Sequence, residues 1–208
     1  MARIARITAD RTGRRRRIVL DDGRRLDCPA NIARRRGLAV GDDLDPRRWE
    51  SLEGEVRRQA CLDAGLRLLA RKAHATARLA AKLTRRFDPQ DVAAVIDELR
   101  RLGYLNDSRL AMEEAQRLCE LGMERERALA RLLRHGLDEP KAREAVGSAY
   151  RNSDPVEEAK EVARRLTRTA RGTPAAQRRK LLGALSRRGF DDEVVRRAVE
   201  EVLGPDVD

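Results

Sequence analysis

The stretch Leu185-Ser186-Arg187-Arg188-Gly189-Phe190-Asp191 indicates a repeat protein, because its pattern also occurs earlier in the chain, at Leu132-Leu133-Arg134-His135-Gly136-Leu137-Asp138. In both stretches a Leu stands five residues before an apolar residue, and Gly directly precedes that apolar residue. A third copy, Leu83-Thr84-Arg85-Arg86-Phe87-Asp88, is one residue shorter and has no Gly. Another apolar residue follows nine positions later in each copy, namely Ile96, Val146 or Val199. A self-similar period of about 50 residues is typical of an array of helical repeats.

The residues of this signature have local physical reasons. Gly directly after a helix is the common left-handed C-terminal cap, and an Asp that follows can cap the next helix. Asp88, Asp138 and Asp191 are the expected caps, and further helices are expected to begin at Asp154-Pro155 and Thr173-Pro174, since Pro suits a first helical turn. The pattern predicts a mainly α chain with three three-helix repeats in an elongated, curved array, at 55–103, 107–151 and 154–203, followed by a tail at 204–208.

Residues 1–50 differ from the repeats and are expected to form a small strand-containing module. Ile4 and Ile7 lie in the first expected strand, and Asp21-Asp22-Gly23 separates two further extended runs, which is a hairpin signal. A short helix is expected after Pro29, ending near Gly37. The run Arg14 to Arg17 is expected at a loop tip where the first strand pair turns, with nonspecific phosphate contact as one role.

The composition of the 208 residues sets limits on the class of protein. Hydrophobic residues make up 41% and aromatic residues 2%, which favours helices over a β-sandwich. No apolar run approaches the ~20 residues of a membrane span, so no membrane partner is expected. Cys28, Cys61 and Cys119 form no CxxC pair, and we expect reduced thiols in a cytoplasmic protein without metal or cofactor.

The formal net charge is +11, and two windows contain basic residues without any Asp or Glu. The first, from Ala64 to Phe87, contains Arg67, Arg71, Lys72, Arg78, Lys82, Arg85 and Arg86. The second, from Val162 to Phe190, contains Arg164, Arg165, Arg168, Arg171, Arg178, Arg179, Lys180, Arg187 and Arg188.

Ordered surfaces of one sign indicate a polyanion or a strongly acidic groove as partner. The alternative is an ordinary solvated helix face, but such faces normally mix signs, as the expected helical region 107–126 does. With so few aromatic rings for base stacking, nucleic-acid contact should be electrostatic and tolerant of sequence.

Catalysis is not expected. The two histidines, His74 and His135, are far apart in sequence, and His135 takes the place of an Arg in the other repeats, which indicates a surface position. No P-loop, nucleophile elbow or His-x-x-x-His pair is present.

The turn Gly103-Tyr104-Leu105-Asn106-Asp107, preceded by Leu102 and followed by Leu110-Ala111, resembles the most recognisable signature of the RecX family. The Gly136 and Gly189 stretches, and the run from Ala60 to Leu69, are also similar to that family's repeats. The resemblance covers roughly residues 55–203. It implies an all-helical triple repeat that lodges in the groove of the RecA–DNA filament and inhibits the ATPase and strand exchange of RecA, without catalysis of its own.

The chain departs from the family pattern in its first repeat. The family usually has a Ser with a Glu three residues later before the second helix, a capping box, where this chain has Ala75 and Arg78. Leu110 stands where an aromatic residue is usual. The central turn has two interpretations: Tyr104 and Leu105 contact a partner, or Tyr104 packs between modules while Asn106 or Asp107 caps the following helix.

Two functions follow from these observations. The first is a monomeric regulator that binds the RecA–DNA filament and inhibits RecA, which places the chain in recombination, DNA repair and the SOS response. The alternative is a DNA-binding protein that contacts phosphates of single- or double-stranded DNA without sequence preference and without RecA.

Overall fold

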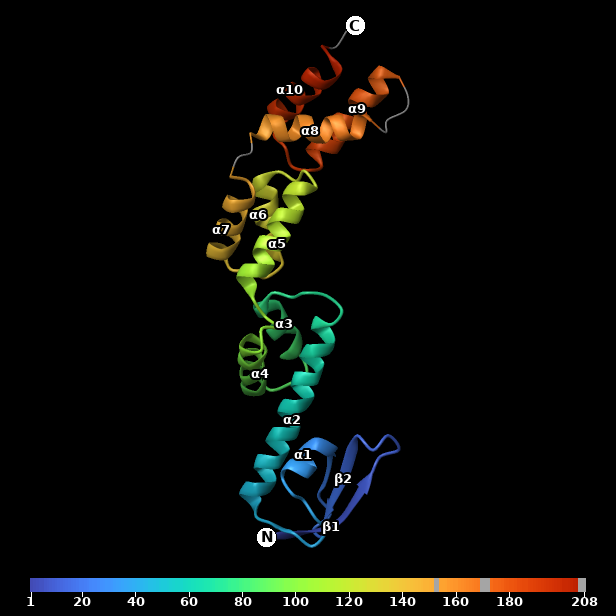
Figure 1. Cartoon of the computed structure of the whole chain (residues 1–208), viewed down its shortest axis with the longest axis vertical. Coiled ribbons are helices and arrows are strands. Elements are labelled where there is room, and N and C mark those ends of the chain that lie inside the picture. Colours follow the sequence, from blue (N-terminus) through green and yellow to red (C-terminus); the bar gives the residue numbers. More distant parts are fainter. Residues whose placement is uncertain (152–153, 169–172, 206–208) are drawn as a thin grey trace. The chain divides into compact units, whose positions relative to one another are not determined.

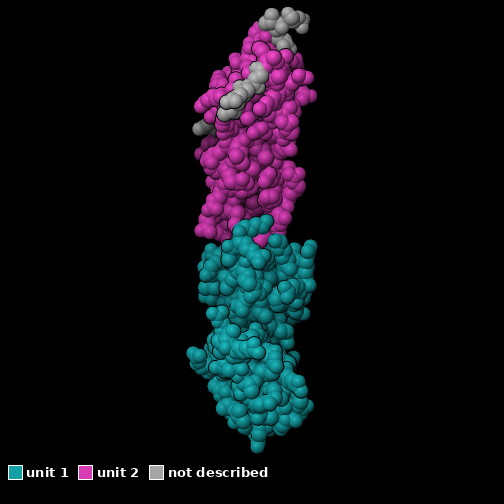
Figure 2. Space-filling model, turned by 90° about the vertical axis from the view of Figure 1, so that its right-hand side faces the viewer, with its two compact units in different colours: residues 1–72, 79–104 teal, residues 73–78, 105–208 magenta. Residues whose placement is uncertain are grey.

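A computed structural model describes residues 1–151, 154–168 and 173–205. The chain divides into two compact units (Figure 2), which we call unit 1 (residues 1–72 and 79–104) and unit 2 (residues 73–78 and 105–208).

The expectation of a mainly helical chain behind a small strand-containing module is confirmed (Figure 1). The strands are β1 (Ala2–Ala9), β2 (Arg15–Leu20), β3 (Arg25–Pro29) and β4 (Asp43–Leu44). The helices are α1 (Ala30–Arg35), α2 (Pro46–Leu69), α3 (Thr76–Leu83), α4 (Pro89–Arg101), α5 (Asp107–Glu120), α6 (Arg125–Arg134), α7 (Glu139–Ala149), α8 (Pro155–Thr167), α9 (Pro174–Ser186) and α10 (Asp192–Leu203).

The four strands form an antiparallel sheet in the order β3-β2-β1-β4. The expected hairpin joins β2 to β3, and Gly23 takes the left-handed conformation in its turn with φ +88°. One face of the sheet packs on α1 and α2 through an aliphatic core that includes Ile4, Ile18 and Leu20. The expectation that Arg14 to Arg17 form a loop tip is wrong for Arg15–Arg17, because these residues pair along β2 with Asp27, Cys28 and Pro29 of β3.

Helix α2 begins at Pro46, well before residue 55, where the helical pattern was expected to start. The side chain of Asp45 caps it by accepting a hydrogen bond from the backbone N–H of Arg48, and Pro46 suits the first turn. Its first turns bury Trp49, Leu52 and Val56 in the core of the strand module. One helix therefore contributes to both the strand module and the helices that follow.

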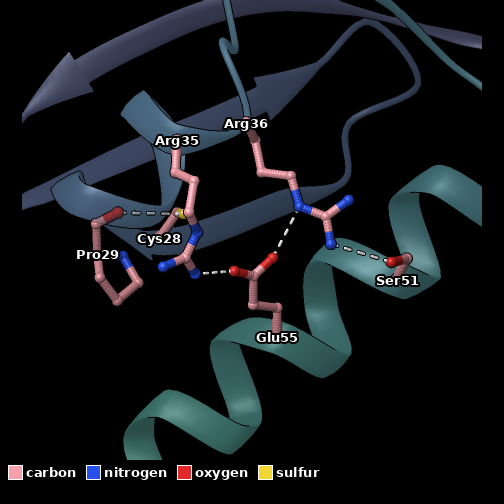
Figure 3. A network of polar contacts seen from close by, with 6 residues as sticks. All are labelled: Cys28, Pro29, Arg35, Arg36, Ser51 and Glu55. Atoms are coloured by element: carbon pink, nitrogen blue, oxygen red, sulfur yellow. Dashed lines mark hydrogen bonds and ion pairs between the residues drawn. The ribbon is translucent and has the colours of Figure 1, made fainter.

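A polar network fixes the C-terminal end of α1 against α2 (Figure 3). The Nε of Arg36 donates to Glu55 at 2.7 Å and its Nη2 donates to Ser51 at 3.1 Å, while Arg35 also binds the Glu55 carboxylate. Burial disfavours the charged form of Glu55, but the hydrogen bonds from the two arginines outweigh this effect and lower the pKa of that carboxyl. Beside this network, the Cys28 thiol donates to the Pro29 carbonyl at 3.4 Å.

The repeat signature forms the helix ends as the sequence predicts. At Gly136, with φ +88°, the backbone N–H donates to Leu133 O at 2.9 Å, and the Leu137 N–H reaches Leu132 O at 3.3 Å, the two bonds of a Schellman motif. The expected N-caps are confirmed, since the carboxylates of Asp88, Asp138 and Asp191 accept hydrogen bonds from backbone N–H groups at the starts of α4, α7 and α10.

Unit 2 contains two aliphatic cores. One lies among α5, α6 and α7, and the other among α8, α9 and α10. Signature residues of the repeats are buried in these cores, including Leu132, Val146, Leu185 and Phe190. Gly122, which ends α5 with φ +64°, lies so close to α8 that a Cβ added there would be 2.1 Å from Cγ2 of Val162. The turn after α5 thus packs tightly on α8.

Candidate polyanion-binding surface

The solvent side of α9 is a cationic surface. With 100° per residue in an α-helix, Arg179, Lys180 and Arg187 fall within an arc of about 100°, and all three are exposed. The opposite side of the helix buries Leu181 and Leu185 in the core. Helix α9 contains no Asp or Glu, and within the described residues none of the three cations forms an ion pair. We call Arg179, Lys180 and Arg187 the α9 surface.

Arg164 and Arg168 add two exposed cations at the C-terminal end of α8. They lie four residues apart and so share a side of the helix. Positive charge at the C-terminal end of a helix interacts favourably with the helix dipole, and so does the negative charge of Glu157 and Glu158 in the first turn of α8. Lys160, on the same helix, is instead neutralised within the protein, because its ammonium group contacts the carboxylates of both Glu157 and Glu201 at 2.5 Å.

Three arginines of this window satisfy backbone carbonyls. The guanidinium of Arg165 donates to Glu120 O at 3.1 Å, and that of Arg188 donates to Ala184 O at 3.0 Å and Leu121 O at 3.5 Å. Arg178 donates to Gly204 O beyond α10. The expectation that the whole window is one binding surface is therefore too broad, because these three side chains cap helix C-termini. Arg171 lies outside the described residues.

The electrostatics around Arg188 show an excess of positive charge. Burial, together with the guanidinium groups of Arg165 and Arg187, lowers the pKa of Arg188. Arg127 lies close to Arg188 as well, since a Cβ added to the next residue, Gly189, would be 2.8 Å from the Cδ of Arg127. Sequence reasoning missed Arg127, because the flanking Glu124 and Glu126 make α6 appear mixed in charge.

The first basic window does not form one surface within either unit. Arg78 belongs to unit 2, and the other six cations belong to unit 1. Within unit 2, Arg78 lies beside Gly136, because a Cβ added to this glycine would be 3.3 Å from the Cβ of Arg78. Arg67, Arg71, Lys72, Arg85 and Arg86 are exposed, and Lys82 is partly buried. These cations remain candidates for contact with an anionic partner.

In the turn before α5, Tyr104 and Leu105 differ in exposure from what was expected. Tyr104 is 56% exposed, so the expectation that it packs between modules is wrong. Leu105 is the buried residue, because the Schellman bonds at Gly103, which has φ +77°, direct the chain so that Tyr104 faces solvent. Asn106 caps α5 by accepting from the N–H of Arg109 at 2.9 Å. The carboxylate of Asp107 instead binds Thr76.

Other kinds of site find little support in the part of the chain that the structure describes. No group of three or more His, Cys, Asp or Glu residues there could hold a metal ion, and no described helix is long and apolar enough to cross a membrane. His74 is buried, and His135 is partly buried, so the surface position expected for His135 is only partly correct. Burial raises the pKa of Cys61 to about 11 and also raises the pKa of Cys28 and Cys119. All three thiols are therefore poor nucleophiles at neutral pH.

Comparisons with known proteins agree on one family. Models of the first and third three-helix domains of RecX match residues 61–99 and 153–199. The Regulatory protein RecX of Chlorobaculum tepidum is 32% identical over 152 residues, which cover 72% of this chain and 92% of the relative. That of Halorhodospira halophila is 35% identical over 149 residues, which cover 70% and 90%.

Two solved structures show the same fold at 18% identity. A crystal structure of regulatory protein RecX matches with a TM-score of 0.64 over 95% of this chain and 98% of the other. The structure of RecX from Lactobacillus salivarius matches with a TM-score of 0.53 over 70% of this chain and 96% of the other.

Proposed function

Because this chain belongs to the RecX family of regulatory proteins, we propose that it binds the RecA–DNA filament and lowers the ATPase and recombination activity of RecA. It acts in the cytoplasm as a monomer, without cofactor or catalysis of its own. This role places it in the regulation of recombination, DNA repair and the SOS response.

The α9 surface is the observation that carries this proposal. Arg179, Lys180 and Arg187 are held on a folded helix whose other side is packed, and no carboxylate of the described residues neutralises them. Some solvated helix faces elsewhere in the chain pair their charges, as Arg143 does with Glu139 and Arg196 does with Glu193. A filament of protein on DNA presents phosphates and acidic side chains along its length, which such a surface complements.

The aromatic residues indicate that contact with DNA is made through phosphates. Trp49, Tyr150 and Phe190 are buried, Phe87 is partly buried, and Tyr104 is exposed. A single exposed ring provides no platform for successive bases. Phosphate contacts position a protein on DNA without reading sequence, which suits a regulator of a filament that forms on any sequence.

The test is ATP hydrolysis by RecA on single-stranded DNA, measured with increasing amounts of this protein at two salt concentrations. We expect inhibition at substoichiometric to equimolar ratios that persists when a modest excess of bare DNA is added as competitor. Unchanged hydrolysis and strand exchange would overturn the proposal. Inhibition that the competitor abolishes would show instead a DNA-binding protein that does not require RecA.

A further inference from the structure

The face of the N-terminal sheet that points away from α1 and α2 carries a set of arginines outside both basic windows. Strand pairing places Arg6 of β1 and Arg25 of β3 opposite Val19, one on each side of the central strand. Both arginines are exposed, whereas the adjacent inward pairs contain the buried Ile18 and Leu20. With strands about 4.8 Å apart, the two Cα atoms lie roughly 10 Å apart.

A β-bulge puts Arg6 on this face. Ala2 and Ile4 point into the core, so strict alternation would direct Arg6 inward and Ile7 outward. The register of β1 shifts between Ile4 and Arg6, so that Ile7 pairs with Ile18 on the inner side and Arg6 pairs with Val19 on the outer side. Bulges re-aim side chains in this way. The alternating sequence pattern alone therefore gives the wrong side for Arg6.

The charges on the outer face do not balance. Five strand arginines (Arg3, Arg6, Arg15, Arg17 and Arg25) share it with two strand aspartates, and these aspartates are already paired: Arg17 binds Asp27 at 2.9 Å and Arg3 binds Asp43 at 3.1 Å. At the strand ends, the carboxylates of Asp10 and Asp21 accept hydrogen bonds from the backbone N–H groups of Arg15 and Arg3. Within the described residues, Arg6 and Arg25 form no ion pair. Asp22, in the turn beside Arg25, pairs with Arg24 at 2.7 Å. The guanidinium of Arg15 donates to the backbone carbonyl of Asp27 at 2.7 Å. The guanidinium groups of Arg6 and Arg25 are thus left to bind an external anion.

We propose that this outer face binds the phosphate backbone of nucleic acid, with Arg6 and Arg25 each contacting a phosphate. Guanidinium groups bind phosphate oxygens in a bidentate manner, and two of them across a flat sheet suit a repeating anion. A protein partner is disfavoured, because interfaces are centred on buried apolar or aromatic anchors, and Val19 is the one aliphatic residue in this row. The hollow of about 210 Å³ at the other end of the face is lined mainly by charged residues, among them Asp10, Arg15 and Asp27.

The test compares binding of the full-length protein and its Arg6→Gln/Arg25→Gln variant to fluorescent mixed-sequence DNA, duplex and single-stranded, over a series of salt concentrations. The matched control is Arg47→Gln/Arg101→Gln, which removes the same charge from exposed arginines on α2 and α4. RecA is left out, so the result does not depend on the function proposed above. Circular dichroism checks that both variants are folded.

Loss of two phosphate contacts should reduce the slope of log affinity against log salt by roughly 1.8 for duplex and 1.4 for single strands. We expect the sheet variant to bind roughly tenfold more weakly at low salt, with the control close to the native protein. An unchanged slope, or an equal loss in the control, would overturn the proposal. In a separate assay with RecA filaments, a variant that keeps its affinity for bare DNA but no longer binds the filaments would also overturn the proposal, since the face would then contact protein.

Discussion

The carboxylate of Asp107 accepts hydrogen bonds from both the backbone N–H and the hydroxyl of Thr76, at 2.9 and 3.0 Å. Thr76 is the first residue of α3, and Asp107 is the first residue of α5. The start of α3 has Ala75 and Arg78 at the positions of the family's capping box. A side chain from another helix therefore supplies an acceptor that a local cap would otherwise provide.

Replacing Asp107 with Ala should expose the start of α3. Without the acceptor, the partly buried N–H of Thr76 has no carboxylate partner, and we expect a loss of about 1–2 kcal/mol in unfolding free energy, as for the loss of an N-cap. Amide exchange at Thr76 should become faster. Denaturant unfolding and hydrogen exchange measure the two effects. Asp97→Ala, which removes an exposed carboxylate of α4, is the control, and an equal loss in that variant would show that Asp107 has no special role.

The sequence predicts those features whose causes lie within a few residues. Asp138 caps α7 and Gly136 ends α6 because each acts on its own turn of backbone. The role of Asp107 could not be predicted this way, since its partner is 31 residues away. Arg179 and Arg188 look equivalent in the sequence, yet packing places the carbonyl of Leu121 beside Arg188 and leaves Arg179 exposed.

The fit between α8 and the turn after α5 makes Gly122 sensitive to substitution. An alanine there would occupy a left-handed conformation that costs roughly 1–2 kcal/mol, and its Cβ would overlap Val162, which adds about 1–3 kcal/mol of overpacking. We expect Gly122→Ala to lower the unfolding free energy by about 2–5 kcal/mol.

Gly147 is the matched control for this substitution. It lies inside α7 with no atom within 4 Å of an added Cβ, so Gly147→Ala should stabilise the protein by up to about 1 kcal/mol. Thermal unfolding of the two variants should move in opposite directions. A shift of the same sign and size in both would contradict the tight contact at Gly122.

The buried thiol of Cys61 predicts a loss of stability at alkaline pH. Burial raises its pKa to about 11 in the folded chain, while a free cysteine ionises near 8.5. Between these values the unfolded chain has lost the proton that the folded chain retains, so the unfolding free energy falls as the pH rises from about 8.5 to 11. Urea unfolding at pH 7.5 and 10.5 measures this change. The Cys61→Ala variant should show a smaller difference between the two pH values, and an identical difference would assign the effect to other groups.

Charge reversal on the α9 surface tests the proposed mode of action. In the variant Arg179→Glu/Lys180→Glu/Arg187→Glu, three exposed cations become acids while the packed side of α9, with Leu181 and Leu185, is untouched. We expect at least about a tenfold rise in the concentration needed for half-inhibition of the RecA ATPase at physiological salt, because attraction becomes repulsion. Helicity measured by circular dichroism should not change.

A control with the same change in charge separates this surface from the net charge of the protein. Arg100, Arg143 and Arg196 are exposed and paired with Asp97, Glu139 and Glu193 on their own helices, so their reversal changes the total charge equally without touching α9. We expect the control to inhibit RecA nearly as well as the native protein. If both variants lost inhibition equally, overall charge would explain the effect; if the α9 variant inhibited normally, Arg179, Lys180 and Arg187 would have no part in binding the filament.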